Sequence, residues 1–166
     1  MDASHPPSAT NGFHGAHAAL LLASYQRLLG RPLLGRPLLG LAPGDDPGRA
    51  LYEAAFVLLS HGTETDPLFN YANRAAQELF GYPWETFVGL PSRLSAEPLV
   101  REERERLLRR VADQGFIDDY AGVRVAADGR RFRIQQAVVW NLVDETGTLQ
   151  GQAACFHQWV PLVVPG

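Results

Sequence analysis

The sequence predicts an α+β fold in which a five-stranded antiparallel sheet carries short helices on one face. The order of its segments supports this prediction: two strand-like segments, then helices, then three strand-like segments. The first two, FVLLSH (56–61) and LFNYA (68–72), flank the turn-forming GTETDP and are typical of a hairpin. The last three, FIDDYAGVRV, RFRIQQAVVWNLV and LQGQAACFHQW, are separated by AADGR and DETGT, each with a glycine at a turn position.

The helical middle of the chain is broken into short pieces. Asn73 can cap the first helix through its side-chain oxygen, and Gly81 can end it. Pro83 and Pro91 follow, and because proline has no N–H to donate, neither can lie inside a long helix. We therefore expect only one-turn helical pieces after each of them. The longest helix is expected over residues 97–114, with Glu and Arg four residues apart on its solvent face.

The first 40 residues are expected to lie outside the sheet domain. Residues 1–12 are small, polar and proline-containing, which favours disorder, whereas residues 13–29 carry a wide apolar stripe at helical spacing. The repeat GRPLLGRPLLG (30–40) is too short for a solenoid and is typical of a linker. The predicted organisation is a disordered tail (1–12), a helix with linker (13–40), the sheet domain (41–160) and a C-terminal tail (161–166).

The composition excludes several classes of function. The 166 residues carry a net charge of -3, so no excess of positive charge is present to hold a phosphate backbone, and a direct nucleic-acid partner is not expected. All 15 cationic residues are arginine, which excludes a P-loop and a Schiff-base lysine. No apolar run approaches the roughly 20 residues of a membrane span. Cys155, the single cysteine, allows no internal disulfide, and we expect a cytoplasmic protein without a membrane partner.

Several segments resemble a known family. NRAAQELFGYPWETFVG (73–89) is similar to the core pattern of PAS domains. LLSHGTETDPLFNYANRAAQELF, LPSRLSAEP, REER, QGFIDDYAGVR and GRRFRIQQAVVWNL resemble the MEKHLA family of PAS-like domains, from about Leu20 to Trp159. The resemblance implies a sheet over which short, interrupted helices curve to enclose a small cavity. It implies a sensory or regulatory role but no particular ligand.

The predicted lining of that cavity follows from strand alternation. Along RFRIQQAVVWNLV, every second residue from Phe132 to Leu142 is expected on one face, with Gln136 as the polar member. Gln136 would need a hydrogen-bond partner, which a ligand, a water or the backbone could supply. On the last strand the small inward residues leave room for a ligand or allow close helix packing. The candidate ligand-binding residues are Phe80, Phe132, Ile134, Gln136, Val138, Trp140, Ala153 and Cys155.

No particular cofactor is indicated. Flavin-binding light-sensing PAS domains carry their reactive cysteine in a helical motif after the region similar to GLPSRLSAEP, where this chain has none, so we expect no flavin adduct. Neither His61 nor His157 matches the helix position of the haem ligand in haem-binding PAS sensors, and haem is not expected. His14 and His17 are three residues apart but lack a nearby third ligand, so no metal site is predicted.

No catalytic set is predicted either. SHGTETDP holds Ser60, His61 and Asp66, but the segment lacks a nucleophile elbow and is better explained by hairpin turn chemistry. Asp118 and Asp119 are adjacent in a strand and should therefore face opposite sides of the sheet. We expect a protein that is not an enzyme.

These observations leave three functions open. The leading one is a non-enzymatic PAS-like sensory or regulatory module that binds a small ligand between sheet and helices and signals through protein contacts. The alternative is a dimerisation or protein-interaction module with a self-filled pocket, and a small α+β hydrolase or isomerase is the least supported. A homodimer is expected because the apolar stripe of residues 13–29 must be covered, although packing on the same chain's sheet would also cover it.

Overall fold

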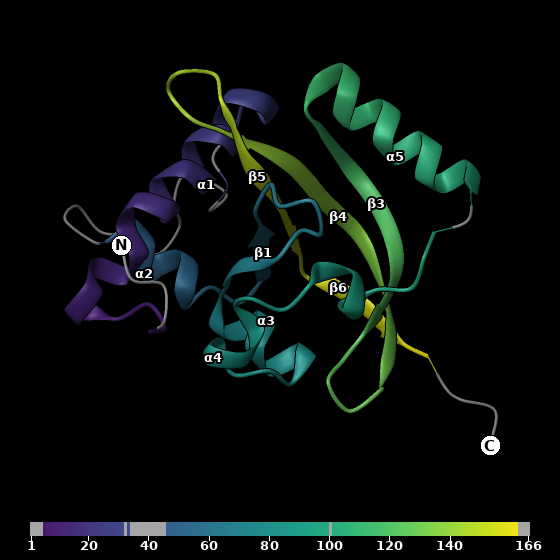
Figure 1. Ribbon diagram of the computed structural model, residues 1–166, viewed down its shortest axis with the longest axis horizontal. Coiled ribbons are helices and arrows are strands. Elements are labelled where there is room, and N and C mark those ends of the chain that lie inside the picture. Colours follow the sequence, from purple (N-terminus) through teal and green to yellow (C-terminus); the bar gives the residue numbers. More distant parts are fainter. Residues whose placement is uncertain (1–4, 32, 34–45, 100, 163–166) are drawn as a thin grey trace.

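The α+β prediction is confirmed in the computed structural model, which describes residues 5–31, 33, 46–99 and 101–162 (Figure 1). Within these residues one antiparallel sheet has the strand order β2-β1-β5-β4-β3, and β6 pairs with the first half of β4. Its strands are β1 (Val57–His61), β2 (Phe69–Ala72), β3 (Phe116–Val125), β4 (Arg131–Val143), β5 (Leu149–Phe156) and β6 (Gln158–Pro161).

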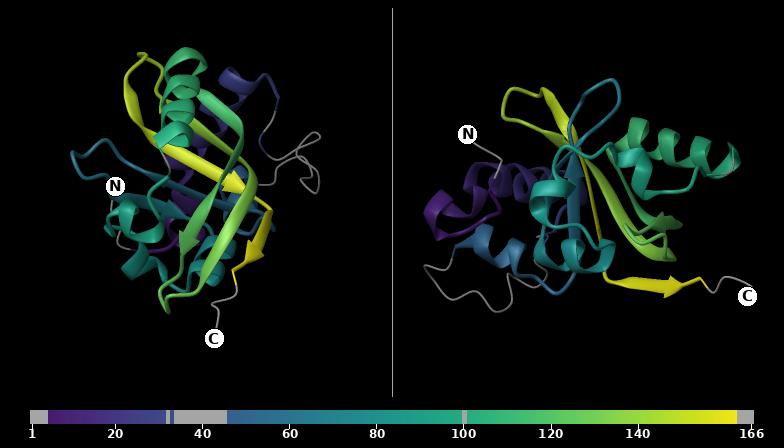
Figure 2. Two further views of the ribbon diagram at one scale, coloured as in Figure 1. Left: turned by 90° about the vertical axis from the view of Figure 1, so that its right-hand side faces the viewer. Right: turned by 60° about the horizontal axis from the view of Figure 1, so that its bottom comes forward.

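The sheet is the middle layer of the molecule. In the right-hand view of Figure 2, α1 and α5 lie on opposite sides of the strands. We call the face that packs against α3 and α5 the inner face, and the face covered by α1 the outer face. The helical elements are η1 (Ala9–His14), α1 (Gly15–Leu29), α2 (Pro47–Tyr52), α3 (Arg74–Phe80), α4 (Trp84–Phe87), η3 (Ser92–Ser95) and α5 (Arg101–Gln114).

The short helices follow the predicted capping signals. Asn73 accepts a hydrogen bond from the Ala76 N–H at the start of α3, and Gly81 ends that helix in the left-handed region. The long helix α5 begins at Arg101 rather than at residue 97. The reason is that Ala96 forms a β-bridge with Arg124, which keeps the chain before α5 extended.

Two apolar cores lie on the two faces of the sheet. The inner core includes Leu59, Phe80, Phe87, Phe132, Ile134 and Val139. The outer core includes Leu21, Tyr25, Leu58, Val138, Trp140 and Leu142.

The predicted alternation along β4 is wrong beyond Gln136. This residue has φ +52°, in the left-handed region that a non-glycine residue rarely adopts. The backbone turns there, so that the even-numbered residues, which face the inner core before Gln136, face the outer core after it. Two register shifts in the pairing of β3 with β4 occur beside Tyr120, which is opposite Ala137. The strand therefore presents two different faces along its length.

The N-terminal helix covers the outer face of its own sheet. Leu21 and Tyr25 of α1 are buried in the outer core, and Ser24 Oγ donates to the Val143 carbonyl of β4 over 3.1 Å. The apolar stripe is thus covered within the chain, which removes the argument on which the expected homodimer was based. The helix begins at Gly15 because Phe13 and His14 have positive φ, and Gly30 ends it as predicted.

The expected boundaries need correction in three places. Residues 9–12, expected to be disordered, belong to η1, where the Asn11 side chain accepts from the Ser8 N–H. Pro161, expected to begin the C-terminal tail, is the last residue of β6. The last strand divides at His157 into β5 and β6, opposite the turn at Gln136. Most of the GRPLLGRPLLG linker lies outside the described residues.

Candidate functional site

A cavity of about 230 Å³ lies on the inner face of the sheet. Its floor is a row of side chains across three neighbouring strands, because Leu59 of β1 and Val139 of β4 both pair with Ala154 of β5. Alanine between two larger side chains leaves space above the sheet. Leu107 of α5 and Phe69 of β2 complete the apolar part of the wall.

The rest of the wall is polar and contains two guanidinium groups. No acidic residue lines the cavity among the described residues, so the local charge is positive although the chain is acidic overall. The polar lining residues are His61, Ser92, Arg93, Arg124 and Gln152.

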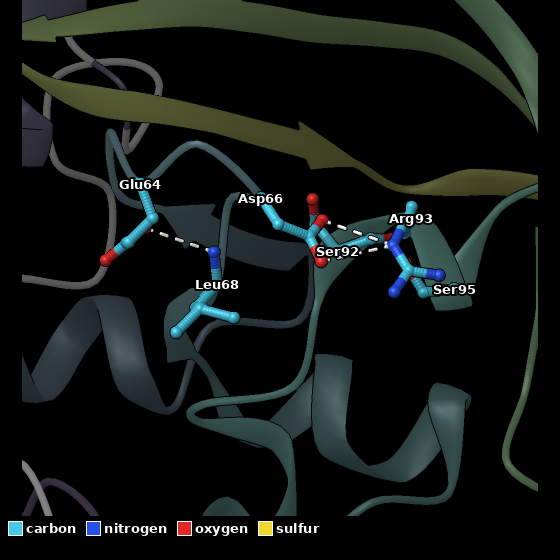
Figure 3. A network of polar contacts seen from close by, with 6 residues as sticks. All are labelled: Glu64, Asp66, Leu68, Ser92, Arg93 and Ser95. Carbon is cyan, nitrogen blue, oxygen red and sulfur yellow. Dashed lines mark hydrogen bonds and ion pairs between the residues drawn. The ribbon is translucent and has the colours of Figure 1, made fainter.

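Arg93 is positioned by the β1–β2 hairpin loop. Its Nε lies 3.2 Å from each carboxylate oxygen of Asp66, and Figure 3 shows the two side chains facing each other. The loop itself is braced by Glu64, which accepts from the Leu68 N–H over 3.1 Å, and this hydrogen bond lowers the pKa of the Glu64 carboxyl. The Ser92 N–H donates to the Pro67 carbonyl and attaches η3 to the same loop.

Arg124 comes from β3, on the far side of the cavity from the hairpin. Its guanidinium carbon lies 5.7 Å from the centre of the Tyr120 ring, at cation–π distance. It forms no ion pair within the described part of the chain. The cavity is therefore lined by a half-buried arginine that has no carboxylate partner among the described residues.

His61 and Gln152 stand opposite each other in the pairing of β1 with β5. The close approach of these strands depends on Gly151, where a Cβ would collide with the His61 carbonyl oxygen. The Nδ1 of His61 lies 2.9 Å from the Gly62 carbonyl, so it carries a proton and donates. The other ring nitrogen, Nε2, is left for other partners.

A second cavity, of about 280 Å³, lies on the outer face near the C-terminal end of α1. Tyr25, Arg31 and Asp118 line it together with Gln136 and Cys155. Burial raises the pKa of the Cys155 thiol to about 12, so the thiol stays protonated and is a poor nucleophile. Cys155 also packs with the outer core, across the sheet from the inner cavity.

The eight predicted binding residues are not brought together. Three belong to the closely packed inner core, where the rings of Phe80 and Phe132 lie 5.3 Å apart; the third is Ile134. Trp140 is buried on the outer face against Tyr25 of α1. Ala153 joins the outer core and also borders the inner cavity. The remaining three line the outer cavity: Gln136, Val138 and Cys155.

The sequence reasoning missed the polar residues of the inner cavity. Ser92 and Arg93 lie in LPSRLSAEP, a segment that already carried the family resemblance, but alternation cannot detect a residue in a helical turn. Arg124 lies in a predicted strand, but it lines the cavity only because η3 packs close to that strand, and the sequence does not show this packing. One signal in the sequence could have indicated these residues: Arg93 and Arg124 lie in the two segments that flank the long helix.

A buried polar network connects α1 to the sheet. Ser60 Oγ donates to the Asn70 side-chain oxygen over 2.6 Å, and His17 Nε2 lies 2.9 Å from the same hydroxyl. Burial, with a smaller contribution from the charge of His14, lowers the pKa of His17 to about 4. Ser60 is fully buried and so cannot meet a substrate; its histidine partner is His17 and not the neighbouring His61.

The other candidate groups also remain apart. Asp118 lines the outer cavity, whereas Asp119 pairs with Arg106 of α5, so the two carboxylates face opposite sides as predicted. Within the described ranges, no group of three His, Cys, Asp or Glu side chains could hold a metal ion. A search of the same residues finds no helix with the length and apolar character of a membrane span.

Comparisons with known proteins agree with the geometry. Residues 15–161 match the family model of the MEKHLA domain. The homeobox-leucine zipper protein HOX9 of rice (Oryza sativa) is 28% identical over 152 residues, which cover 86% of this chain and 16% of the rice protein. The chain thus spans about one sixth of the length of that relative.

Solved structures share the fold at low identity. A PAS domain of a Colwellia psychrerythraea protein has a TM-score of 0.53 and 15% identity, covering 69% of this chain and 92% of that domain. An RNA-binding light-oxygen-voltage receptor has a TM-score of 0.56 and 22% identity, covering 78% of this chain and 35% of the receptor. At these identities the likeness establishes the PAS-like fold.

Proposed function

The chain belongs to the MEKHLA domain family, and on this premise we propose that it is a non-enzymatic sensory or regulatory module that binds a small ligand in the inner cavity. The observation that carries the proposal is the cavity itself, which lies between the sheet, η3 and α5. An apolar floor with a few convergent polar groups is the usual composition of a ligand site.

The size of the cavity limits the ligand. Drug-sized ligands occupy pockets of about 300–1,000 Å³. The inner cavity, at about 230 Å³, is smaller than this range and suits a compact molecule. Because Cys155 packs on the opposite face of the sheet, the proposal includes no covalent bond between ligand and thiol.

We propose α5 as the element that transmits the signal. Of its described residues, Leu107 lines the cavity and none is fully buried, so few apolar contacts hold this helix in place. Arg106 of α5 pairs with Asp119 of β3, which connects the helix to the strand that carries Arg124. A ligand against Leu107 would shift α5 and alter the surface that its charged residues and the exposed Leu108 present to a partner protein.

Native mass spectrometry of the purified protein tests the proposal, together with a small-molecule stability screen. Ala154→Leu would fill the space between Leu59 and Val139, and Ala127→Leu adds the same atoms at an exposed turn. We expect a bound small molecule, or stabilisation by one, in the wild type and in Ala127→Leu, and its loss in Ala154→Leu. Binding that survives equally in Ala154→Leu would contradict the inner cavity as the site, and a complete lack of binding would contradict a ligand-binding function.

Self-association is the second candidate function, and one surface favours it. Trp159 and Val160 of β6 are 37% and 47% exposed, whereas the apolar stripe of α1 is covered within the chain. A homodimer would therefore use β6 rather than α1. The same native spectra report the oligomeric state, and a dimer that persists in Trp159→Ser with Val160→Thr would contradict this surface.

A further inference from the structure

The charge of the inner cavity indicates the class of its ligand. Two guanidinium groups and one imidazole border a space that is lined by no acidic side chain of the described residues. Building on the proposed binding function, we propose that the ligand is a small organic carboxylate, with its carboxylate at Arg124 and its apolar body over Leu59 and Val139.

Arg124 is the group that most needs such a partner. It is partly buried, it lies against the Tyr120 ring, and it has no ion pair among the described residues. A cation removed from water is costly unless an opposite charge approaches it. The ring contact supplies no hydrogen-bond acceptor in its plane, and no hydrogen bond of the Arg124 guanidinium N–H groups is found among the described residues. The planar N–H edge of a guanidinium matches the two oxygens of a carboxylate and binds them with paired hydrogen bonds.

Arg93 is already neutralised in part. Its Nε faces Asp66, and its side chain is 66% exposed, so it lies at the mouth of the cavity. This arrangement makes Arg93 a steering group for an arriving anion, while Arg124 is the primary partner. The hydroxyl of Ser92 and the amide of Gln152 line the same cavity and can each donate one hydrogen bond to the anion.

The apolar floor distinguishes an organic carboxylate from inorganic phosphate. Leu59, Val139 and Ala154 form a continuous row on which a hydrocarbon chain or ring can pack. Phosphate cannot use this surface and would leave it in contact with water. The volume of about 230 Å³ accommodates a short chain or a single ring.

The test uses pairs of probes with the same shape and different charge. Hexanoate is compared with hexanamide, and benzoate with benzamide, by isothermal titration calorimetry on the full chain, with inorganic phosphate as a third arm. We expect at least one carboxylate to bind about tenfold more tightly than its amide, the difference expected from a hydrogen-bonded charge. Phosphate should bind more weakly than that carboxylate.

Variants assign the effect to Arg124. Arg124→Gln should weaken binding of the carboxylate about tenfold and leave amide binding nearly unchanged. Arg133→Gln is the matched control, because Arg133 is exposed on β4 and does not line the cavity. Equal losses in the two variants, or equal affinity of carboxylate and amide, would overturn the carboxylate assignment. So would the failure of both carboxylates to bind at millimolar concentration.

The two proposals fail differently. If an amide binds as well as its carboxylate, and Ala154→Leu abolishes both, the binding function stands and the ligand class is wrong. If neither the probes nor a co-purifying molecule binds the wild type, the binding function fails as well.

Discussion

Replacement of Asn73 should destabilise the protein far more than the loss of a helix cap. The side chain is completely buried and makes four hydrogen bonds. Its oxygen accepts from the N–H groups of Leu58 and Ala76, over 3.1 and 3.0 Å. Its nitrogen donates to the carbonyls of Leu51 and Phe56, over 3.1 and 2.9 Å. One amide thus joins α2, β1 and α3.

The expected cost of Asn73→Ala follows from these four bonds. Loss of the cap to Ala76 costs about 1 kcal/mol. Loss of the other three bonds leaves the Leu58 N–H and the Phe56 carbonyl without this partner and removes one of the donors to the Leu51 carbonyl, at about 1 kcal/mol each. We therefore expect a loss of about 4 kcal/mol, which for a chain of this size lowers the melting temperature by roughly 8–16 °C.

Urea denaturation followed by circular dichroism measures this loss. Asn141→Ala is the matched control, because its partly buried side chain accepts one hydrogen bond, from Gln152, over 3.3 Å. It should cost less than about 1 kcal/mol. Asn73→Asp keeps the two acceptors but places a carboxylate against the carbonyls of Leu51 and Phe56, so it should be at least as harmful as Asn73→Ala. If Asn73→Ala cost no more than Asn141→Ala, the network would not hold the three elements together.

Three further predictions concern α1 and β4. Trp140→Ala should lower the free energy of unfolding in urea by about 3–5 kcal/mol. Trp140→Phe should cost less than half of that, because the buried indole N–H has no hydrogen-bond partner among the described residues that phenylalanine would lose. Equal losses in the two variants would contradict this expectation. Burial lowers the pKa of His17 from 6.5 to about 4, so as the pH falls the unfolded chain binds this proton before the folded chain does. The free energy of unfolding should therefore fall by up to about 3 kcal/mol as the pH drops from about 6.5 to 4. His17→Gln should flatten this part of the pH profile, and an unchanged slope would refute the assignment. Gln136→Gly should raise the free energy of unfolding in urea slightly, by up to about 1 kcal/mol, because glycine adopts positive φ without strain. Gln136→Val should lower it, and the opposite order would show that the turn in β4 is not as described.

The sequence by itself determined the elements and much of their order. Asn73 and Gly81 fix the ends of α3 by local hydrogen bonding and backbone conformation, and these signals do not depend on distant residues. Pro83 and Pro91 stand directly before α4 and η3, and they separate these short elements from the chain that precedes them, because proline cannot lie inside a helix. The family resemblance, which the match over residues 15–161 confirms, added the PAS-like arrangement of these elements, and the likeness to solved PAS-domain structures supports that arrangement.

The tertiary structure alone decided which residues share a face and which side chains meet. Period-two alternation is a rule for regular strands, and one residue at positive φ, Gln136, reverses it for the rest of β4. Arg93 and Arg124 approach one cavity from segments on either side of α5, and His17 reaches Ser60 from 43 residues away. Such meetings depend on how helices pack on a sheet, which is set by the whole apolar core and not by any local pattern.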